Sequence, residues 1–436
     1  MGGIDFKGLS AEILYMKDLQ EKSGIKMEVI RHGKYKSAVE PFLAQEMSPE
    51  NREQMTVLLN SVWNTIVGDI AKSRKLSIAQ LNAIANSLGA RTPELALANK
   101  LVDKVAYEDE YHNAIRAKLK IGKKEEYPIV SVIDYAKTVA STVEDYSKKD
   151  IIAVVYAQGE IMSGEGDVTI IGEGSIKRSL EEARKDKDVK AIVLRIDSPG
   201  GNALTSELIW REIEITKKAK PVVVSMGNYA ASGGYYIAAN ADRIFAEANT
   251  ITGSIGVFGM LPNLNQLGKN IGINAEQVKT HENASGYSVF EPIDENFKGF
   301  VLESIEKTYA TFLKRVADGR KMTTSQVDAI AQGRVWTGID AHKIGLVDEL
   351  GGLDDAIKYA AKLGKTSSYR TENFPEYEKS FEELFANFTG MAMFKTKEQL
   401  LKEQLGDEGF QMLEQIKRVK SRKGIQAMMP YEIEIH

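Results

Sequence analysis

Ser225-Met-Gly-Asn-Tyr-Ala-Ala-Ser-Gly-Gly-Tyr-Tyr-Ile-Ala-Ala-Asn240 is the stretch of sequence that decides the fold, and Ser232 lies at its centre. The apolar run Pro221-Val-Val-Val224 before it predicts a buried strand, and the residues after Gly234 predict a helix. Ser232 is therefore expected where a strand gives way to a helix, with the N–H groups of Gly233 and Gly234 free to face a negative charge. Such a position suits a nucleophile, although a serine that simply caps a helix has the same local pattern.

A second glycine turn lies upstream of this stretch. Residues 189–196 predict a strand that runs into Asp197-Ser-Pro-Gly-Gly201, and a helix is predicted over about 203–217. The proline and the two glycines let the backbone approach a ligand closely and point its N–H groups outward. Because parallel strands end at one edge of a sheet, this turn is expected beside Ser232. One turn would supply a hydroxyl, and the other would supply part of an oxyanion hole.

The composition of the chain excludes several classes of function. Its 436 residues are enough for two or three domains. Lys and Arg (57) are interleaved with Asp and Glu (61), and the net charge is −4, so no nucleic acid partner is expected. The chain has no cysteine, which excludes disulfides, thiol nucleophiles and thiolate metal sites. Clustered histidine ligands and a phosphate-loop lysine are also missing from the sequence, so no metal and no cofactor are expected.

No stretch of the sequence predicts a membrane-spanning helix. Residues 1–7 lack the basic and apolar regions of a signal peptide. The longest uncharged window, residues 221–241, is long enough to cross a bilayer. It contains Ser225, Asn228, Ser232 and three glycines, however, and this is too polar and too rich in helix breakers for a helix in lipid. A strand followed by a helix explains the window better.

The chain also contains an internal repeat. Five blocks of similar sequence recur in the same order and at a nearly constant offset. The matched blocks are 23–25 with 271–273, 36–42 with 287–293, 71–76 with 317–322, 80–85 with 326–331, and 101–103 with 346–348. This order predicts a duplicated unit.

The two copies are predicted to be unequal. The second includes both glycine turns, whereas the first is expected to lack about 100 residues upstream of Met1, so the chain resembles a fragment. We expect the C-terminal half of a first copy over 1–120, a linker over 121–149, a complete second copy over 150–364, and a helical tail with a terminal strand over 365–436. Near the start, the apolar spacing predicts a helix over 8–22.

These residues resemble the motifs of the signal peptide peptidase A family in its long form, which has two copies of a unit similar to the Clp protease and crotonase folds. The most specific motifs are residues 227–235 and 197–201, together with Tyr35-Lys-Ser-Ala-Val-Glu-Pro-Phe42. The resemblance implies an α/β fold of tandem spiral units. It also implies that Ser232 is the nucleophile, that Lys36 is the general base, and that Ser254 binds the lysine amine.

The residues themselves also favour a lysine base. The chain has five histidines, and none lies about 25 residues after Ser232, where a Clp-like triad would have one. A lysine can take the serine proton if burial lowers its pKa from about 10.4 towards neutrality. The repeat partner of Lys36 is Tyr287, so each copy is expected to supply one catalytic group. The spacing leaves open whether the two groups meet within one chain or across a subunit interface.

The expected reaction is peptide hydrolysis through an acyl-enzyme. Ser232 attacks, Lys36 takes and returns the proton, and the N–H groups of Gly233 and of Gly200 or Gly201 hold the oxyanion. The resemblance implies that the substrates are hydrophobic signal peptides, cleaved and left in the bacterial cytoplasmic membrane. It further implies a homotetramer whose active sites face outside the cytoplasm, attached to the membrane through an N-terminal anchor that is missing from this chain.

Two other functions remain open from the sequence. A crotonase-type enzyme would use the same glycine turns to stabilise the enolate of an acyl thioester, but it would need a carboxylate near them in place of Ser232 and Lys36. A non-catalytic scaffold would follow if the incomplete first copy left Lys36 out of position.

Overall fold

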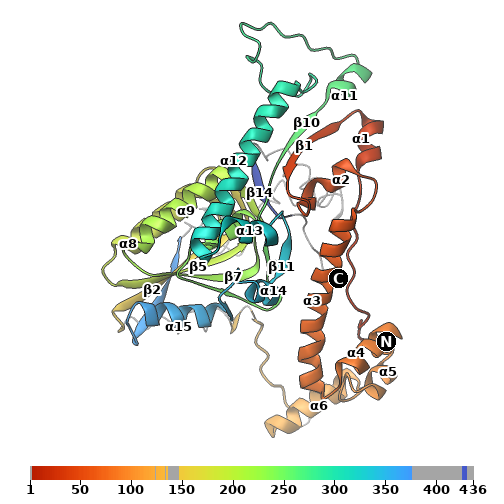
Figure 1. Ribbon diagram of the computed structural model, residues 1–436. Helices are drawn as coiled ribbons and strands as arrows, with labels where there is room; N and C mark the ends of the chain where they lie inside the picture. The colour runs from red at the N-terminus through yellow and green to blue at the C-terminus, as the bar shows by residue number, and fades with distance from the viewer. Residues whose placement is uncertain (1, 123, 133, 136–146, 376–424, 430–436) are drawn as a thin grey trace, which may run out of the picture. The chain divides into compact units, whose positions relative to one another are not determined.

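The computed structural model describes residues 2–122, 124–132, 134–135, 147–375 and 425–429 (Figure 1). Contacts divide the described residues into two units, one within 1–12 and 56–149, the other within 13–55 and 150–432. Lys36 and Ser232 both belong to the second, larger unit. Of the predicted tail over 365–436, residues 376–424 and 430–436 lie outside the described residues, so its helical character stays a prediction. The predicted bounds of the two sequence copies also stay a prediction.

The larger unit is built on a mainly parallel sheet. Its strands are β2 (Asp150–Gln158), β5 (Val189–Ser198), β7 (Val222–Ala231), β8 (Arg243–Ala246), β9 (Ile251–Gly253), β11 (Val335–Thr337), β12 (Glu349–Leu350) and β13 (Tyr369–Phe374). The strand order is β11-β9-β7-β5-β2-β13, and β8 pairs with β7 and β12. Every pairing is parallel except that of β11 with β9. The central strands read as continuous apolar runs because a parallel sheet is covered on both faces.

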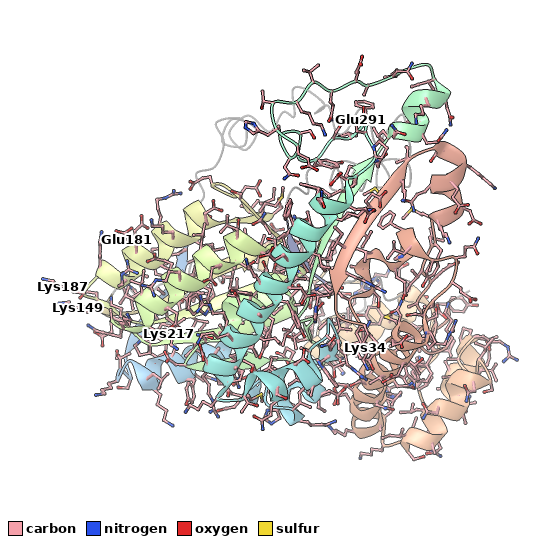
Figure 2. The ribbon with its side chains drawn as sticks, turned by 45° about the horizontal axis from the view of Figure 1, so that its top comes forward. Lys34, Lys149, Glu181, Lys187, Lys217 and Glu291 are labelled. Atoms are coloured by element: carbon pink, nitrogen blue, oxygen red, sulfur yellow. The ribbon has the colours of Figure 1, made fainter. Side chains whose placement is uncertain are left out.

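Helices cover both faces of this sheet. They are α8 (Glu173–Lys185) and α9 (Ala203–Lys217) on one face and α15 (Leu353–Leu363) on the other (Figure 1). Each face of the sheet has its own hydrophobic core, and alternate side chains of β5 enter one or the other. Ile192 and Leu194 pack towards α8 and α9, whereas Val193 packs towards α15. Glu181 and Lys187, at the outer end of the α8–α9 layer, point away from the sheet (Figure 2). The predicted strand over 189–196 and helix over 203–217 are thus confirmed.

A second, smaller sheet lies in the same unit. Its strands are β1 (Lys26–His32), β3 (Glu160–Met162), β4 (Ile170–Gly172), β6 (Gly200–Asn202), β10 (Val257–Asn263) and β14 (Gln426–Met428). Their order is β1-β10-β14-β6-β3-β4. The pairings of β1 with β10, β10 with β14 and β14 with β6 are antiparallel, and the remaining two are parallel. A short strand near the C-terminus therefore joins the two halves of this sheet.

The remaining helices of the larger unit are short, apart from α12, which packs across β1 and β10. They are α1 (Lys17–Ser23), the 3-10 helix η1 (Ser37–Val39), α2 (Glu40–Leu43), α10 (Gly233–Ala238), α11 (Asn265–Asn270), α12 (Glu295–Arg320), α13 (Thr324–Ile330) and α14 (Gly338–Lys343). The helix predicted over 8–22 is wrong in extent, since only its last part, α1, is helical. The N–H of Met16 instead donates to the Pro41 carbonyl at 2.7 Å, a tertiary contact that overrides helix propensity.

The smaller unit is helical among its described residues. It contains α3 (Pro49–Arg74) from Thr56 onward, α4 (Ile78–Asn86), α5 (Pro93–Ala98) and α6 (Glu108–Leu119). Ser48 caps the start of α3, because its hydroxyl accepts a hydrogen bond from the Asn51 N–H at 3.2 Å.

Matched elements reveal the duplication in three dimensions. Helices α3 and α12 both have 26 residues, and the helix after each begins with a capping box. Arg74 pairs with Asp103 at 3.0 Å, and at the corresponding repeat positions Arg320 pairs with Asp348 at 2.6 Å. The α/β class and the repeat inferred from sequence blocks are therefore confirmed.

Candidate active site

Ser232 lies at the junction between β7 and α10, as predicted. Its N–H donates to the Gly253 carbonyl, and its own carbonyl accepts from the Tyr236 N–H, both at 2.8 Å. Its backbone has φ 55° and ψ −114°, a conformation that glycine adopts far more readily than serine. A fully buried, strained serine held by backbone bonds on both sides is a feature that clusters at functional sites.

The side chain of Lys36 reaches this serine from the first part of the chain. Lys36 follows β1 and precedes η1, and its Nζ lies 2.8 Å from the Ser232 Oγ. The same nitrogen donates to the Ser254 Oγ and to the Ser254 carbonyl oxygen, each at 3.0 Å. All three residues have no exposed surface. The structure thus brings together, within one chain, the serine, the lysine and the second serine singled out from the sequence.

Burial controls the charge of the lysine. Removal from water lowers the pKa of Lys36 well below its ordinary value of 10.5, and no charged neighbour contributes to the shift. A neutral amine has two N–H donors and one lone pair. Two acceptors on Ser254 can take both donors, which leaves the lone pair directed at the Ser232 hydroxyl. The arrangement can therefore accept the serine proton, because the resulting ammonium has three acceptors within reach.

Two glycines that sequence reasoning missed give Lys36 its space. A Cβ on Gly333 would lie 2.6 Å from the Lys36 Cβ, and one on Gly256 would lie 3.1 Å from the Lys36 Cδ. Nearby, the Tyr35 N–H donates to the Gln332 carbonyl at 2.9 Å. The sequence signal of Gly256 and Gly333 is weak, since isolated glycines in loops are common.

The glycines predicted for the oxyanion hole also lie together. Gly200 and Gly201 form β6, with φ values of 100° and 154°. A Cβ on Gly200 would lie 2.7 Å from the Gly233 nitrogen, and one on Gly233 would lie 3.2 Å from the Gly201 nitrogen. The backbones of Gly200, Gly201 and Gly233 therefore lie in close contact with no room for a side chain between them, and the Gly200 N–H donates to the Ser198 Oγ at 3.1 Å.

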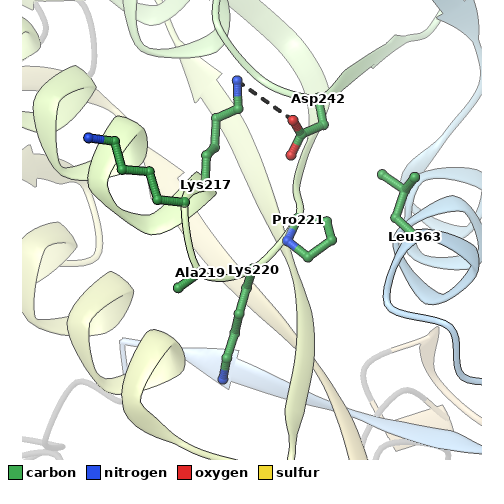
Figure 3. Close-up of a pocket in the computed structure, with 7 residues that line it drawn as sticks. Lys217, Ala219, Lys220, Pro221, Asp242 and Leu363 are labelled. Atoms are coloured by element: carbon green, nitrogen blue, oxygen red, sulfur yellow. Dashed lines mark ion pairs between the residues drawn. The ribbon is translucent and has the colours of Figure 1, made fainter.

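A separate hollow lies at the end of α9. It has a volume of about 340 Å³ and is lined by residues 217–221 with Asp242 and Leu363. Lys217 points towards Asp242, with which it forms an ion pair of 3.6 Å (Figure 3). Ser232, Lys36 and Ser254 are not among its lining residues. Among the described residues, no group of three acidic or histidine side chains is arranged to hold a metal ion.

Comparison with known proteins identifies the family of this chain. Residues 1–122 and 214–367 match peptidase family S49. The chain belongs to this family. Among its relatives are Protease 4 of Haemophilus influenzae (38% identity over 375 residues, 83% of this chain and 60% of the relative) and the chloroplastic serine protease SPPA of Arabidopsis thaliana (34% over 358 residues, 81% and 53%). A putative signal peptide peptidase SppA of Enterococcus faecium is 36% identical over 187 residues, 43% of this chain and 54% of the relative.

The S49 family confirms the resemblance inferred from the motifs. The chain spans about three-fifths of the length of the Protease 4 sequences that it matches. In the part of the chain that the structure describes, no helix is both long enough and apolar enough to cross a bilayer.

Proposed function

We propose that this chain is a serine endopeptidase that uses Ser232 as nucleophile and Lys36 as general base. The observation that carries the proposal is the 2.8 Å contact between the Lys36 Nζ and the Ser232 Oγ in a site without exposed surface. A serine hydroxyl needs a base within hydrogen-bonding distance, and a lysine can act as that base when it is uncharged. Membership of peptidase family S49 supports the same chemistry.

The reaction follows from the positions of the groups. The Ser232 Oγ attacks the peptide carbonyl while Lys36 takes its proton and later returns it to the leaving amine. The amides of Gly233 and of Gly200 or Gly201 stabilise the tetrahedral oxyanion, and each such donor contributes about 3 kcal/mol to transition-state binding. Ser254 orients the lysine through its two acceptors.

The substrate class rests on the family. We propose that the substrates of this site are signal peptides that have been cleaved and left in the bacterial cytoplasmic membrane. The name of the Enterococcus faecium relative supports this choice. A membrane-attached homotetramer with its active sites facing outside the cytoplasm belongs to the same proposal.

The two alternatives have less support. A crotonase-type thioester enzyme would need a carboxylate beside the glycine turns, whereas the group that contacts Ser232 is an amine. A scaffold would not need an uncharged lysine, whose burial costs stability.

A fluorophosphonate probe tests the proposal, because such probes react with activated serine nucleophiles. We expect labelling and hydrolysis of an apolar reporter peptide by the wild type, and neither by Ser232→Ala or Lys36→Ala. Lys34→Ala is the matched control, because Lys34 is an exposed lysine two positions away (Figure 2). Undiminished labelling of Lys36→Ala, with a folded protein by circular dichroism, would remove the lysine from the mechanism.

A further inference from the structure

A buried glutamine on α3 contacts the backbone on two sides of the lysine site. Gln54 lies in the second turn of α3 and is 1% exposed. Its Nε2 donates to the Tyr35 carbonyl oxygen at 3.3 Å, and its Oε1 accepts from the Val335 N–H at 3.0 Å. The Tyr35 carbonyl belongs to the peptide group that precedes Lys36. One side-chain amide therefore joins the loop of Lys36 to strand β11.

Strand β11 and the loop before it hold Lys36 against Ser254. The Gln332 carbonyl accepts from the N–H of the residue before Lys36 at 2.9 Å, and the Arg334 carbonyl accepts from the Ser254 N–H at 2.7 Å. Between these two carbonyls, a Cβ on Gly333 would lie 2.6 Å from the Lys36 Cβ. A shift of this loop relative to Lys36 would therefore change the position of the lysine amine relative to Ser254.

A chain of buried side chains sets which way the Gln54 amide points. Its Nε2 also donates to the Asn51 Oδ1 at 3.4 Å, and the Asn51 Nδ2 donates to the Glu40 Oε2 at 2.7 Å. The Tyr15 hydroxyl donates to the same Glu40 oxygen at 3.4 Å. Asn51 is 0% exposed and Glu40 is 3% exposed. Because a carboxylate accepts hydrogen bonds and does not donate them, Glu40 fixes the Asn51 amide, which in turn fixes the Gln54 amide.

The Gln54 amide has all its polar atoms paired with buried partners. Both Nε2 hydrogens have an acceptor, and the oxygen has a donor. A buried polar network whose members are all satisfied is rigid, because the low dielectric strengthens each bond. The Lys36 amine has its own partners on Ser232 and Ser254. The network therefore acts on the lysine through its backbone.

The second sequence copy provides an internal comparison. Helices α3 and α12 have the same length, and their third and sixth residues are Asn51 and Gln54 in α3 but Phe297 and Phe300 in α12. Phe300 is 54% exposed. That copy has Tyr287 at the position of the lysine. The copy without the lysine thus also lacks both amides.

We propose that Gln54, held by Asn51 and Glu40, is a positioning residue that keeps Lys36 within hydrogen-bonding distance of Ser232. This inference rests on the proposed peptidase function. Gln54 acts by fixing the peptide group before Lys36 against strand β11, and not on the reacting atoms. Because catalysis depends steeply on the geometry of the reacting groups, a displacement of about 1 Å can slow it about 100-fold.

Gln54→Met tests this role, because methionine has a similar volume and removes the amide hydrogen bonds. We expect kcat for a reporter peptide and the rate of fluorophosphonate labelling to fall at least about 10-fold, with KM within about 2-fold of wild type. The final number of labelled sites per chain should stay unchanged. Gln45→Met, the same change at an exposed glutamine, should behave as wild type. Fewer labelled sites with a wild-type rate at each would show that Gln54 serves stability alone, and would overturn the inference.

A second set of variants tests the chain behind Gln54 and decides the question if Gln54→Met does not fold. Asn51→Asp puts two carboxylates in contact and should slow labelling about 10-fold. Adding Glu40→Gln restores one donor and one acceptor between positions 40 and 51 and leaves an acceptor for the Gln54 Nε2. The double variant should therefore label within about 3-fold of the wild-type rate. A wild-type rate in Asn51→Asp, or no recovery in the double variant, would contradict the proposed chain.

The positioning role and the peptidase function can fail separately. A wild type that neither takes the fluorophosphonate label nor hydrolyses the reporter peptide overturns the peptidase function. A wild type that does both, at the same rates as a folded Gln54→Met, overturns the positioning role alone.

Discussion

The Nζ of Lys36 lies 2.8 Å from the Oγ of Ser232, although 196 positions separate the two residues in the chain. Both side chains are fully buried, and both belong to the larger unit. The two groups meet within one chain, so no neighbouring subunit is needed to complete the pair.

The pH dependence of peptide hydrolysis should report the uncharged lysine. Only the neutral amine accepts the serine proton, so kcat/KM should rise with pH and level off at the pKa of Lys36. Because burial holds this pKa well below 10.5, the plateau should begin far below that pH. Initial rates on a reporter peptide measure the profile. A rate that keeps rising to pH 10.5 would show an ordinary lysine.

Ser254→Ala should slow peptide hydrolysis and shift the acid limb of its pH–rate profile. The variant removes one of the two Ser254 acceptors of the Lys36 amine and leaves the backbone carbonyl. We expect about a 10-fold lower kcat from the lost hydrogen bond. Because that bond also favours the ammonium form, its loss should shift the acid limb to lower pH. An unchanged kcat together with an unchanged acid limb would show that Ser254 does not orient Lys36.

The buried lysine should make stability depend on pH. Between the folded-state pKa and 10.5, the unfolded chain holds one more proton at Lys36 than the folded chain, so stability from this group rises with pH. In a Ser232→Ala background, which removes the nucleophile, Lys36→Met should therefore gain stability relative to its parent as pH falls from 10.5. Urea unfolding at several pH values measures the difference. A difference that is constant with pH would contradict the depressed pKa.

The strained backbone of Ser232 should be visible in a comparison of two inactive variants. Ser232→Gly and Ser232→Ala both lose the hydroxyl, but only glycine relieves a φ of 55° with a ψ of −114°. We expect Ser232→Gly to be more stable than Ser232→Ala by about 1–2 kcal/mol in urea unfolding. Equal stabilities would mean that the conformation costs little.

The duplicated ion pairs should differ in their contribution to stability. Asp348 is 20% exposed and its partner Arg320 is 7% exposed, whereas Asp103 in the other copy is 91% exposed. Burial alone would raise the pKa of Asp348, but its hydrogen bonds with Arg320 and the charge of that residue outweigh burial and lower the pKa.

Asp348→Asn should therefore destabilise the fold by about 3–5 kcal/mol, because it leaves a buried guanidinium without its partner. Asp103→Asn should cost at most about 1 kcal/mol. Unfolding in urea at pH 7 measures both variants. Similar losses would show that burial does not distinguish the two copies.

The features that the sequence predicts well are those that depend on a local pattern of residues. The strand over 189–196, the helix over 203–217 and the strand-to-helix junction at Ser232 each depend on a run of neighbouring residues. The repeat is predictable for a similar reason, since comparison of the sequence with itself shows five matched blocks in the same order without any knowledge of contacts. The helix predicted over 8–22 was too long because a backbone bond from Met16 to Pro41 replaced helical bonds there.

Other features of the larger unit depend on contacts that no local pattern records. Strand β14 has three residues, and it forms because β6 and β10 offer open edges on both sides. Gly256 and Gly333 have no distinctive neighbours, and their importance appears only when Lys36 is packed against them.

The sequence by itself determined the α/β class, the duplication and the residue types of the catalytic chemistry, because periodicity, turn residues and motifs act over short distances along the chain. The tertiary structure alone decided that Lys36 and Ser232 meet within one chain, that burial lowers the pKa of the lysine, and that residues 426–428 pair with residues 200–202. Burial and strand pairing are properties of surfaces brought together by folding, so they depend on the whole arrangement and not on any one segment.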